Sequence, residues 1–433
     1  MTVREIALSL LMEYEEGGKY VNLSLSSHKT DGLTAKDRGF LTVLLYTATE
    51  RKLTYDYIIS ALAERSADDI SKRARNILRL GLCQIMHLDS VPDFAAVNET
   101  VKLAGSRGER GFVNAVLREA LRRKESLPLP DKDKNFARYL SVLYSFPTAL
   151  VKHFINAYGK EGTEALLLCF NSIPKTTLTV NTAKISVDNF LLELKARGYS
   201  ACAADYSKIS VKLDGSVNPC EIFGYKEGYF FVQDEASALA VAALDVAKED
   251  KVVDVCACPG GKSFAAAILS GGAEIRSFDL HESKLSLVRD GAIRLGLDLT
   301  AEKRDATEPS PELFGKIDKV ICDVPCSGLG VLAKKPDLRY KDTEAMQRLP
   351  ALQSEILKSS ARYLKQGGEL VYSTCTLNDA ENRDVILAFL EENPDFAPVD
   401  FTVGALKSEG GILTLLPHVH GTDGFFIAKI KRL

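Results

Sequence analysis

Residues 321–330 read ICDVPCSGLG, and residues 370–377 read LVYSTCTL. Each segment begins as a short apolar run and then breaks into a loop that carries a cysteine. Upstream, residues 252–263 read VVDVCACPGGKS and have the same form, an apolar run followed by a Gly-Gly-Lys turn at an expected helix start. Buried strands of a parallel sheet end in this way, and their loops deliver reactive groups at the carboxyl edge. The three stretches therefore predict one site at a sheet edge, where two thiols and an aspartate face a nucleotide-type cofactor loop.

The region around these stretches alternates strands with helices. The expected strands are 252–257, 274–279, 299–303, 318–323 and 369–374. The expected helices are about 263–270, 282–295, 344–365 and 379–392. Such alternation is typical of a parallel sheet with helices on both faces. Two last strands, 412–417 and 424–430, are close enough in sequence to predict an antiparallel hairpin.

The chain before this α/β region divides into two parts. Residues 1–128 have apolar positions at three- and four-residue spacing, which predicts a bundle of roughly five to seven helices. Residues 126–135, SLPLPDKDKN, have the composition of a linker. Residues 136–225 combine helical spacing with a β-branched run and predict a small α+β module. We therefore expect three domains, with the catalytic one at 226–433, as the length of 433 residues also favours.

The composition is that of an ordinary folded protein, with 46% hydrophobic residues. Nine cysteines follow no regular spacing, and residues 3–14, VREIALSLLMEY, do not have the pattern of a secretory leader. Scattered free thiols are typical of a reducing compartment. No apolar run reaches the roughly 18 residues that are needed to cross a bilayer. We therefore expect a cytoplasmic protein that does not enter a membrane.

The net charge of −3 gives no global indication of nucleic-acid binding, so an RNA contact must come from local basic patches. The clearest patch is 102–124, whose basic residues are Lys102, Arg107, Arg110, Arg118, Arg122, Arg123 and Lys124. A second group, after the first cysteine loop, comprises Lys334, Lys335, Arg339 and Lys341. Basic runs bind phosphates in some proteins and are solvated helix faces in most, and for 102–124 both interpretations stay open.

The loop at the first strand end has features of a cofactor site. Pro259, Gly260 and Gly261 let the backbone approach a ligand, and the helix start beyond them offers unpaired N–H groups. The loop is neither G-x-G-x-x-G nor the Walker pattern, which argues against a dinucleotide or a triphosphate. Asp279 and Asp305 follow the next two strands, where carboxylates commonly meet ribose and the adenine edge. Each aspartate alone would be a helix cap; on successive strands they favour an adenosyl ligand such as S-adenosylmethionine.

Cys326 and Cys375 differ from the other thiols because both directly follow strand ends, beside Pro, Ser or Thr. A lone cysteine is more often a small buried hydrophobe than a nucleophile. We apply that interpretation to Cys83, Cys169, Cys202, Cys220, Cys256 and Cys322. We expect no metal, because the chain has no C-x-x-C pairs with the histidine spacing of a zinc site.

Two thiols beside an adenosyl cofactor suit methylation at carbon 5 of a cytosine in RNA. Carbon 5 is too electron-poor to attack a methyl group, so a nucleophile must first add at carbon 6, and a cysteine thiolate is suited to this. Charge then builds at N3, where Asp323 is placed as an acid or carboxyl partner. A second thiolate, or a water that it holds, can remove the carbon 5 proton. The residues alone do not decide which thiol attacks; a Pro-Cys element, as in DNA methyltransferases, would favour Cys326.

The motifs DVCACPGGK at 254–262, FDL at 278–280, RDA at 304–306, DVPCSGLG at 323–330 and VYSTCTL at 371–377 resemble, in the same order, those of the RNA 5-methylcytosine methyltransferases. This family includes the Sun proteins. Residues 1–125, with FVNAVLRE at 112–119, resemble a NusB-like helical domain, and HGTDGFFIAKI at 420–430 resembles the closing hairpin of the family. The combination points to the RsmB subfamily, the 16S ribosomal RNA (cytosine-967) C5-methyltransferases. The resemblance covers essentially the whole chain.

The resemblance implies a Rossmann-type methyltransferase domain preceded by an all-α NusB-like domain and the small α+β module. It implies that Cys375 attacks carbon 6, that Cys326 assists elimination and release, and that Lys262 and Asp323 lie near the target base. The implied S-adenosylmethionine contacts are Cys256, Ala257, Cys258, Pro259, Gly260, Gly261, Lys262, Asp279, Asp305 and Asp323. The implied substrate is 16S ribosomal RNA, unassembled or in an early intermediate, and not DNA. We expect a monomer.

Four positions depart from the family pattern: Cys258 and Val324 stand where alanine is usual, Leu329 where threonine is usual, and Ala149 where tryptophan is common. Larger side chains beside the cofactor loop could tighten its pocket, but none of these changes removes a group that the chemistry needs. We expect the extra thiol, Cys258, to be a packing residue.

Two alternatives stay open. One is a tRNA cytosine methyltransferase, which a NusB-like bundle disfavours. The other is a non-catalytic RNA-binding or assembly factor with a decayed enzyme domain, which the presence of Asp323, Cys326 and Cys375 disfavours.

Overall fold

The computed structural model describes residues 1–17, 25, 30, 32–215, 217–341 and 343–433. The chain divides into two compact units: unit 1 comprises Met1–Asn171 and Lys335–Tyr340, and unit 2 comprises Ser172–Lys334 and Lys341–Leu433. The division cuts through the predicted module at 136–225, because its first two helices, at 136–144 and 148–170, lie in unit 1, whereas its helix at 187–196 and its strands lie in unit 2. The division into three domains stays a prediction.

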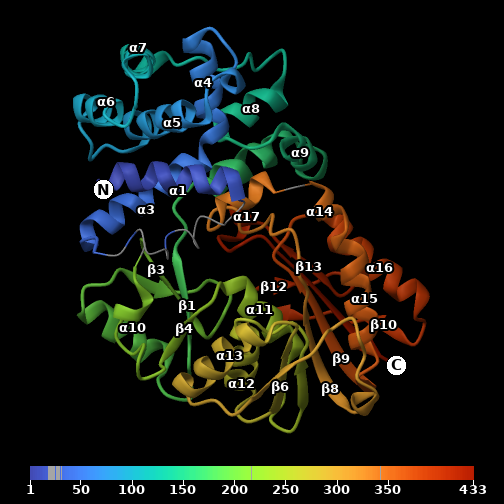
Figure 1. Ribbon diagram of the computed structural model, residues 1–433. Helices are drawn as coiled ribbons and strands as arrows, with labels where there is room; N and C mark the ends of the chain where they lie inside the picture. The colour runs from blue at the N-terminus through green and yellow to red at the C-terminus, as the bar shows by residue number, and fades with distance from the viewer. Residues whose placement is uncertain (18–24, 26–29, 31, 216, 342) are drawn as a thin grey trace. The chain divides into compact units, whose positions relative to one another are not determined.

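Unit 1 is helical (Figure 1), as predicted for the N-terminal region. Its helices are α1 (Val3–Gly17), α3 (Ala35–Glu50), α4 (Lys52–Ala63), α5 (Lys72–His87), α6 (Asp93–Val101), α7 (Arg107–Arg122), α8 (Phe136–Tyr144) and α9 (Thr148–Phe170). Thr34, Ser71 and Ser106 cap three of them by accepting a hydrogen bond from the third backbone N–H of the helix. The apolar helix faces meet in one core, in which Leu41 and Ile77 are fully buried.

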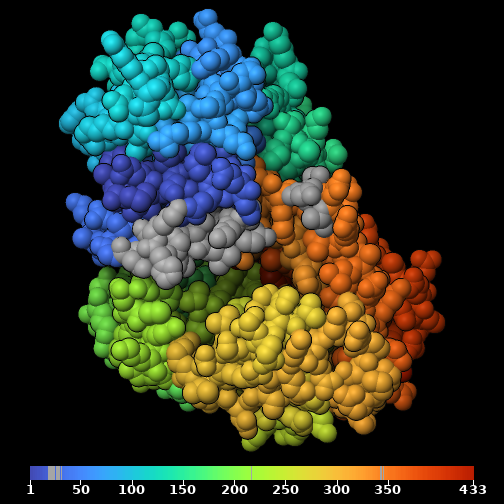
Figure 2. Space-filling view, viewed as in Figure 1, coloured from blue at the N-terminus to red at the C-terminus, as the bar shows by residue number. Residues whose placement is uncertain are grey.

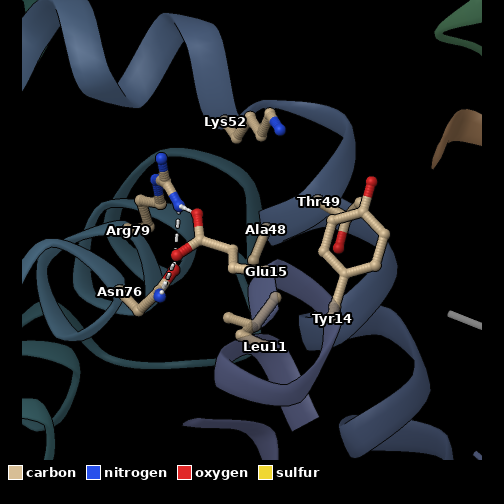
Figure 3. A pocket seen from close by; sticks show the side chains of 8 residues that line it. All are labelled: Leu11, Tyr14, Glu15, Ala48, Thr49, Lys52, Asn76 and Arg79. Carbon is tan, nitrogen blue, oxygen red and sulfur yellow. Dashed lines mark hydrogen bonds and ion pairs between the residues drawn. The ribbon is translucent and has the colours of Figure 1, made fainter. Parts of the chain in front are cut away.

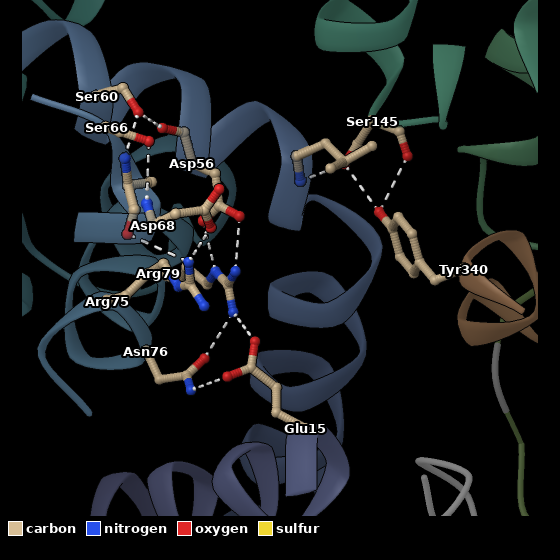
Figure 4. A network of polar contacts seen from close by, with 12 residues as sticks. Glu15, Asp56, Ser60, Ser66, Asp68, Arg75, Asn76, Arg79, Ser145 and Tyr340 are labelled. Atoms are coloured by element: carbon tan, nitrogen blue, oxygen red, sulfur yellow. Dashed lines mark hydrogen bonds and ion pairs between the residues drawn. The ribbon is translucent and has the colours of Figure 1, made fainter. Parts of the chain in front are cut away.

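Helix α5 is buried along most of its length, including the charged side chain of Arg79. A buried charge must be paired. The Arg79 guanidinium donates hydrogen bonds of 2.7 and 2.6 Å to Asp56 on α4 and one of 2.5 Å to Glu15 on α1 (Figure 4). Arg79, Glu15 and Asn76 also line a small pocket together with Tyr14 and Lys52 (Figure 3). Arg79 therefore ties three helices of unit 1 together.

Replacing Arg79 by methionine is expected to lower the free energy of unfolding of unit 1 by about 3–5 kcal/mol, because Glu15 and Asp56 lose their buried partner. Hydrogen exchange of the α1 and α5 amides in urea measures this loss. The control is Arg289→Met, whose ion pair with Glu282 is exposed on both sides, and which should cost less than about 1 kcal/mol. Equal effects of the two substitutions would contradict a structural role for the Arg79 pairs.

The short helix η6 (Pro336–Tyr340) follows a loop of unit 2 in the sequence but packs in unit 1. The Arg339 guanidinium lies 3.9 Å from the centre of the Phe146 ring and donates a 3.0 Å hydrogen bond to Asn171. The neighbouring Tyr340 hydroxyl lies 3.1 Å from Ser145 Oγ (Figure 4). Arg339 is 2% exposed, so the prediction that it contacts RNA phosphates is wrong. A basic residue in a basic run can serve the core when a ring and carbonyl groups surround it.

Unit 2 begins with a small antiparallel sheet in the order β2-β3-β1-β4. Its elements are β1 (Thr176–Val180), α10 (Val187–Ala196), β2 (Ala201–Ala203), β3 (Ser210–Leu213) and β4 (Phe230–Val232). Leu178, Phe190 and Phe230 pack in a core of their own between this sheet and α10. The predicted β-branched run is β1, which is one of the two inner strands. Strand β4 leads directly into the main domain.

The main sheet has the strand order β10-β14-β9-β8-β5-β6-β7, with β13 paired to β14. The strands are β5 (Lys251–Asp254), β6 (Glu274–Asp279), β7 (Thr300–Lys303), β8 (Ile317–Asp323), β9 (Leu364–Thr374), β10 (Phe396–Pro398), β13 (Ile412–Leu415) and β14 (Phe425–Arg432). Strands β5 to β9 run parallel, which confirms the predicted α/β fold class. The predicted hairpin is β13 and β14, and β14 also pairs antiparallel with β9, so the hairpin extends the main sheet.

Helices cover both faces of the main sheet (Figure 1). One layer is α11 (Glu235–Leu244), α12 (Gly261–Ser270) and α13 (Glu282–Leu295); the other is α15 (Leu349–Ala361) and α16 (Arg383–Glu392). Residues alternate between the two cores, as Val252 and Val253 on β5 do. The surface coloured yellow in Figure 2 belongs to the α12–α13 region, which is an outer layer of unit 2. The predicted helix 344–365 is instead α14 (Thr343–Gln347) and α15, because Pro350 begins a new helix.

Candidate active site

The two cysteines that the sequence singled out lie side by side at the carboxyl ends of neighbouring parallel strands. Cys326 follows β8, and Cys375 follows β9. Their sulfur atoms are 3.3 Å apart, and both residues are half-buried. This separation is much longer than the ~2.05 Å of a disulfide, and both cysteines are free thiols. The structure therefore places two thiols in hydrogen-bond contact.

Backbone contacts hold the two cysteine loops against each other and against the closing hairpin. The Gly330 N–H donates a 2.9 Å hydrogen bond to the carbonyl oxygen of Cys375, and the Gly424 N–H donates a 2.8 Å bond to the Gly330 carbonyl. A Cβ at Gly330 would lie 1.9 Å from the Gly424 carbonyl oxygen. Only glycine permits this approach, so the spacing of the Cys326 loop is set by its glycines.

Asp323 ends β8 and faces the cofactor loop through Lys262. The Lys262 ammonium lies 2.7 Å from Asp323 Oδ2 and 3.1 Å from the Ser237 hydroxyl, and it lies 5.2 Å from the centre of the Phe425 ring. The other oxygen of Asp323 accepts a 2.6 Å hydrogen bond from Ser373, which is its register partner on β9. Lys262 is largely buried, whereas the Asp323 carboxylate keeps 29% exposure. The pair can therefore meet a ligand through Asp323.

The cofactor loop leaves β5 at the point where the strand order reverses, with β6 on one side and β8 on the other. Ligands of open α/β sheets bind at such a switch point. Backbone bonds continue beyond the strand: Val255 donates to Ile321 on β8 at 3.1 Å, and Ala257 donates to Phe278 on β6 at 2.8 Å. The predicted strand 252–257 is thus a four-residue strand followed by two bridging contacts. They anchor the loop before Gly260, where α12 begins.

The loop fits an adenosyl cofactor in two respects. Gly260 has a φ of 110°, and a Cβ there would lie 2.4 Å from the Phe264 ring, so the backbone is bare where a ligand would approach. Beneath the loop, Asp254 is fully buried; one oxygen accepts a 2.7 Å hydrogen bond from Ser263, and the other has no partner among the described residues. Burial raises the pKa of Asp254 to about 7. The orphaned oxygen suits a cationic or N–H group of a ligand. Asp254 begins the motif DVCACPGGK, but no local pattern in the sequence indicates a role for it.

Asp279 and Asp305 have different surroundings. Asp279 ends β6 and accepts hydrogen bonds from the backbone N–H groups of Cys258 at 3.3 Å and His281 at 3.0 Å, so it touches the cofactor loop directly. Asp305 follows β7, and one of its oxygens accepts from the N–H and hydroxyl of Thr307 at 2.9 and 2.7 Å. The turn that Asp305 forms with Thr307 therefore accounts for the hydrogen bonds of that oxygen. Its contact with adenine stays a prediction.

The basic residues after the Cys326 loop do not form a free phosphate track. The Lys334 ammonium lies 2.6 Å from Asp234 and 2.8 Å from Asp423, in a largely buried group. Two carboxylates already pair with Lys334, whose side chain keeps 31% exposure, and its contact with RNA phosphates stays a prediction. Lys335 is exposed and Lys341 is half-buried, and their contact with RNA stays a prediction.

The six cysteines that the sequence assigned to packing fall into three groups. Cys83 and Cys322 are buried, Cys169 and Cys256 are half-buried, and Cys202 and Cys220 are exposed. Burial raises the pKa of the Cys83, Cys256 and Cys322 thiols, which suits inert packing groups. The prediction that all six are small buried hydrophobes is wrong for the two exposed residues, which lie on β2 and in the η4 turn at Pro219–Glu221.

Cys258 is expected to be a packing residue, and its surroundings agree with this. It packs partly against the core beneath α11 to α13, and burial followed by the Asp279 carboxylate raises the pKa of its thiol to about 12. Cys258→Ala should therefore leave kcat within about threefold of the wild type, since it restores a smaller apolar side chain. Methyl incorporation into RNA measures this. A loss in Cys258→Ser comparable to that in Cys375→Ser would overturn the assignment.

The basic stretch at 102–124 lies in unit 1, where α7 contributes to the outer surface coloured cyan in Figure 2. Acidic neighbours already meet four of its charges: Glu99 pairs with Lys102, Glu119 with Arg122 and Arg123, and Asp93 with Lys124. The other exposed cations are Arg107, Arg110 and Arg118. RNA contact by this stretch stays a prediction, now centred on three arginines.

Among the described residues, no helix combines the length and apolar character needed to cross a bilayer. Within the same residues, no cluster of three or more His, Cys, Asp and Glu side chains could hold a metal ion.

Comparison with known families divides the chain into matched regions. A family described as 16S rRNA methyltransferase RsmB/F matches residues 241–431. The NusB family matches residues 1–122, and a ferredoxin-like domain of RsmF/B-like methyltransferases matches residues 146–219.

Similar proteins cover the full chain. A protein of Bacillus subtilis (strain 168) named "Probable ribosomal RNA small subunit methyltransferase B" is 37% identical over 100% of this chain and 99% of its own length. A protein of the same name from Synechocystis is 34% identical over the whole of both chains. The solved structure "Crystal Structure of PH0851" matches with a TM-score of 0.79 at 26% identity, covering 99% of this chain and 97% of that one. The chain therefore belongs to the ribosomal RNA small subunit methyltransferase B family, whose members are S-adenosylmethionine-dependent methyltransferases.

Proposed function

We propose that the protein methylates carbon 5 of a cytosine in 16S ribosomal RNA through a covalent bond between Cys375 and carbon 6. The observation that carries this proposal is the pair of sulfur atoms, 3.3 Å apart, at the ends of β8 and β9, of which β8 is next to the strand that leads into the cofactor loop. S-adenosylmethionine supplies the methyl group. The names of the relatives support the small-subunit RNA as substrate, and the resemblance adds cytosine 967 as the target.

Cys375 is the nucleophile of the proposal, and its neighbour supports this assignment. The hydrogen bond to Cys375, together with burial and the charges of Asp323 and Glu381, raises the pKa of the Cys326 thiol well above its usual range. In the proposal, Cys326 keeps its proton and donates it in the sulfur–sulfur hydrogen bond, in which either sulfur can be the donor. Two thiols in contact cannot both ionise easily, so the protonated Cys326 leaves Cys375 as the one that forms a thiolate.

The attack of Cys375 forms a sulfur–carbon 6 bond and moves an electron pair into the ring, toward carbon 5 and N3. In the proposal, the Lys262 ammonium gives a proton to the Asp323 carboxylate, which passes it to N3 as this charge builds. Asp323 retains the exposure needed to reach a base, and Ser373 holds its other oxygen in place. The ring is then nucleophilic at carbon 5.

Cys326 serves as the base that ends the reaction. Once Cys375 is bonded to carbon 6, its sulfur carries no charge. The contact with Cys375, which is the largest cause of the raised Cys326 pKa, then no longer opposes ionisation of Cys326. Cys326 then gives its own proton to solvent water, and its thiolate, or a water that it holds, takes the carbon 5 proton. The electron pair of that C–H bond rebuilds the ring double bond as the Cys375–carbon 6 bond breaks, and N3 returns its proton to the Asp323–Lys262 pair.

The substrate is expected to be RNA whose target base is not shielded by assembled protein, because a base must leave its stack before the thiols and the cofactor can reach carbons 5 and 6. The protein is expected to act as a monomer. The cations proposed to hold phosphates are the exposed Arg107, Arg110, Arg118 and Lys335 and the half-buried Lys341.

Bisulfite mapping of 16S RNA from cells with and without the gene tests the proposal. One cytosine that resists conversion only when the gene is present is the expected result, and addition of the purified protein with S-adenosylmethionine to RNA from the deletion strain should restore it. Methylation of tRNA in place of 16S RNA would favour the tRNA alternative. Absence of methyl transfer to any RNA would favour a non-catalytic assembly factor.

A further inference from the structure

Behind the two thiols lies a buried polar network centred on Glu381, at the end of the η7 turn (Asp379–Glu381). The Glu381 side chain is completely buried. One of its oxygens accepts hydrogen bonds from the Ser327 N–H at 2.8 Å and from Gln353 at 3.0 Å; the other accepts from the Ser327 hydroxyl at 2.5 Å and from Asn378 at 2.9 Å. All four groups donate a hydrogen bond, and a carboxylate can accept hydrogen bonds at both of its oxygens.

The network reaches both cysteine loops through their next residues. Ser327 directly follows Cys326, and Thr376 directly follows Cys375. The Ser327 and Thr376 hydroxyls are 2.6 Å apart, and Thr376 Oγ1 accepts a 3.3 Å hydrogen bond from the Leu329 N–H. The proton order is therefore fixed: Leu329 donates to Thr376, Thr376 to Ser327, and Ser327 to Glu381.

A helix and a strand extend the same network. Gln353 on α15 donates to Glu381 and also, at 2.9 Å, to the carbonyl oxygen of Pro325, the residue before Cys326. The Tyr372 hydroxyl, from β9, donates a 2.6 Å hydrogen bond to the Glu381 carbonyl oxygen. The residues on both sides of Cys326 are thus held from Glu381 and its partner Gln353. Small displacements of reacting groups are costly, since about 1 Å can reduce a rate about 100-fold.

We propose that Glu381 is a positioning residue that fixes the Cys326 and Cys375 loops in their mutual register and whose buried carboxylate acts by its charge on the Cys326 thiol. The hydrogen bonds of Glu381 reach neither the reacting sulfurs nor the cofactor loop, so it acts through Ser327 and Thr376. The catalytic meaning of this role rests on the proposed function; the geometry and the charge effect on the thiol do not.

The charge effect has a definite direction. The Glu381 carboxylate is one of the causes that raise the pKa of Cys326, after the contact with Cys375, burial and Asp323. Removing this negative charge must therefore lower the pKa of Cys326 and make its thiolate more abundant at a given pH. A residue with a purely packing role would not produce this shift.

The first experiment isolates Cys326 in the full-length protein by means of Cys375→Ser. The rate at which iodoacetamide alkylates Cys326 is followed by mass spectrometry across pH, with and without Glu381→Gln. The midpoint is expected to fall by at least about 0.5 pH unit in the Glu381→Gln protein, since a nearby charge shifts a buried thiol by this order or more. An unmoved midpoint overturns the charge part of the proposal.

The matched control is Glu369→Gln in the same background. Glu369 lies on β9, the strand that leads to Cys375, and its carboxylate pairs at 2.6 Å with Lys319 and at 3.0 Å with Lys429. The Glu369→Gln substitution removes a partly buried carboxylate from β9 without changing a residue of the two cysteine loops. If Glu369→Gln shifts the Cys326 midpoint as much as Glu381→Gln does, a general loosening of the sheet explains the result and the proposal is wrong.

A second variant tests positioning with the charge intact. Ser327→Ala removes the hydroxyl that links Thr376 to Glu381 but keeps the carboxylate. We expect kcat for RNA methylation to fall at least about tenfold with KM little changed, because ordering of the loops is lost while binding is not. A kcat within twofold of the wild type overturns the positioning part. If the wild type methylates no RNA, the proposed function fails, while the alkylation experiment still decides the role of Glu381.

Discussion

Replacement of Cys375 by serine is expected to reduce methyl transfer to RNA by at least about 10⁴-fold, because a serine hydroxyl is not ionised at neutral pH and cannot add to carbon 6. Methyl incorporation from labelled S-adenosylmethionine measures the loss. Since the fold around the thiols is held by backbone bonds such as Gly330 N–H to the Cys375 carbonyl, the substitution should leave unfolding unchanged.

Replacement of Cys326 by serine is expected to have a different effect. The first turnover proceeds as far as the Cys375–carbon 6 bond, but the carbon 5 proton is not removed, so a protein–RNA complex that resists denaturant should accumulate. The double variant Cys326→Ser/Cys375→Ser is the control and should form no such complex. If Cys326→Ser abolishes the complex and Cys375→Ser accumulates it, the two thiols exchange roles, as a Pro-Cys nucleophile would require.

The second large effect is expected at the Asp323–Lys262 ion pair. Asp323→Asn keeps the shape of the side chain but removes the charge that meets Lys262 at 2.7 Å. We expect kcat to fall about 10²–10⁴-fold, the range for loss of a positioned proton donor or acceptor. The pair acts as one unit, so Lys262→Met should cost nearly as much, and the double variant little more than either single one.

Single-turnover methylation rates of the three variants measure this coupling. The Lys319–Glu369 ion pair joins β8 to β9 at 2.6 Å, away from the thiols. Glu369→Gln is therefore a suitable control and should leave kcat unchanged. Additive effects at Asp323 and Lys262 would show that the two side chains serve separate purposes. In that case the proposed proton transfer to N3 through the pair would be wrong.

Much of the site could be predicted from local sequence. Each thiol follows an apolar run whose period and length indicate a buried strand, and the carboxyl ends of parallel strands meet at one edge. The expected strand positions agree with β6, β7 and β8 to within one residue, and the register of β8 and β9 places Asp323 opposite Ser373. The cofactor loop was predictable for a similar reason, because Gly260 and its neighbours encode a bare turn in a contiguous stretch.

The fate of the charged residues could not be predicted in this way. Lys334 and Arg339 belong to one basic run, yet Lys334 pairs with two carboxylates in unit 2, and Arg339 lies against Phe146 in unit 1. Composition records a charge but not its partner. The partners of Lys334 come from 100 and 89 residues away in the chain, and no local pattern relates them.

The sequence by itself determined the fold class, the two thiols and the cofactor loop, because each is encoded in a contiguous run whose period or turn chemistry is local. Only the tertiary structure decided how those parts work together. Glu381 lies 54 residues from Ser327, and it becomes the acceptor behind both thiols solely because the β8 and β9 loops and the η7 turn pack at one sheet edge. Which buried donors face a carboxylate depends on long-range packing, and packing is settled by the whole chain at once.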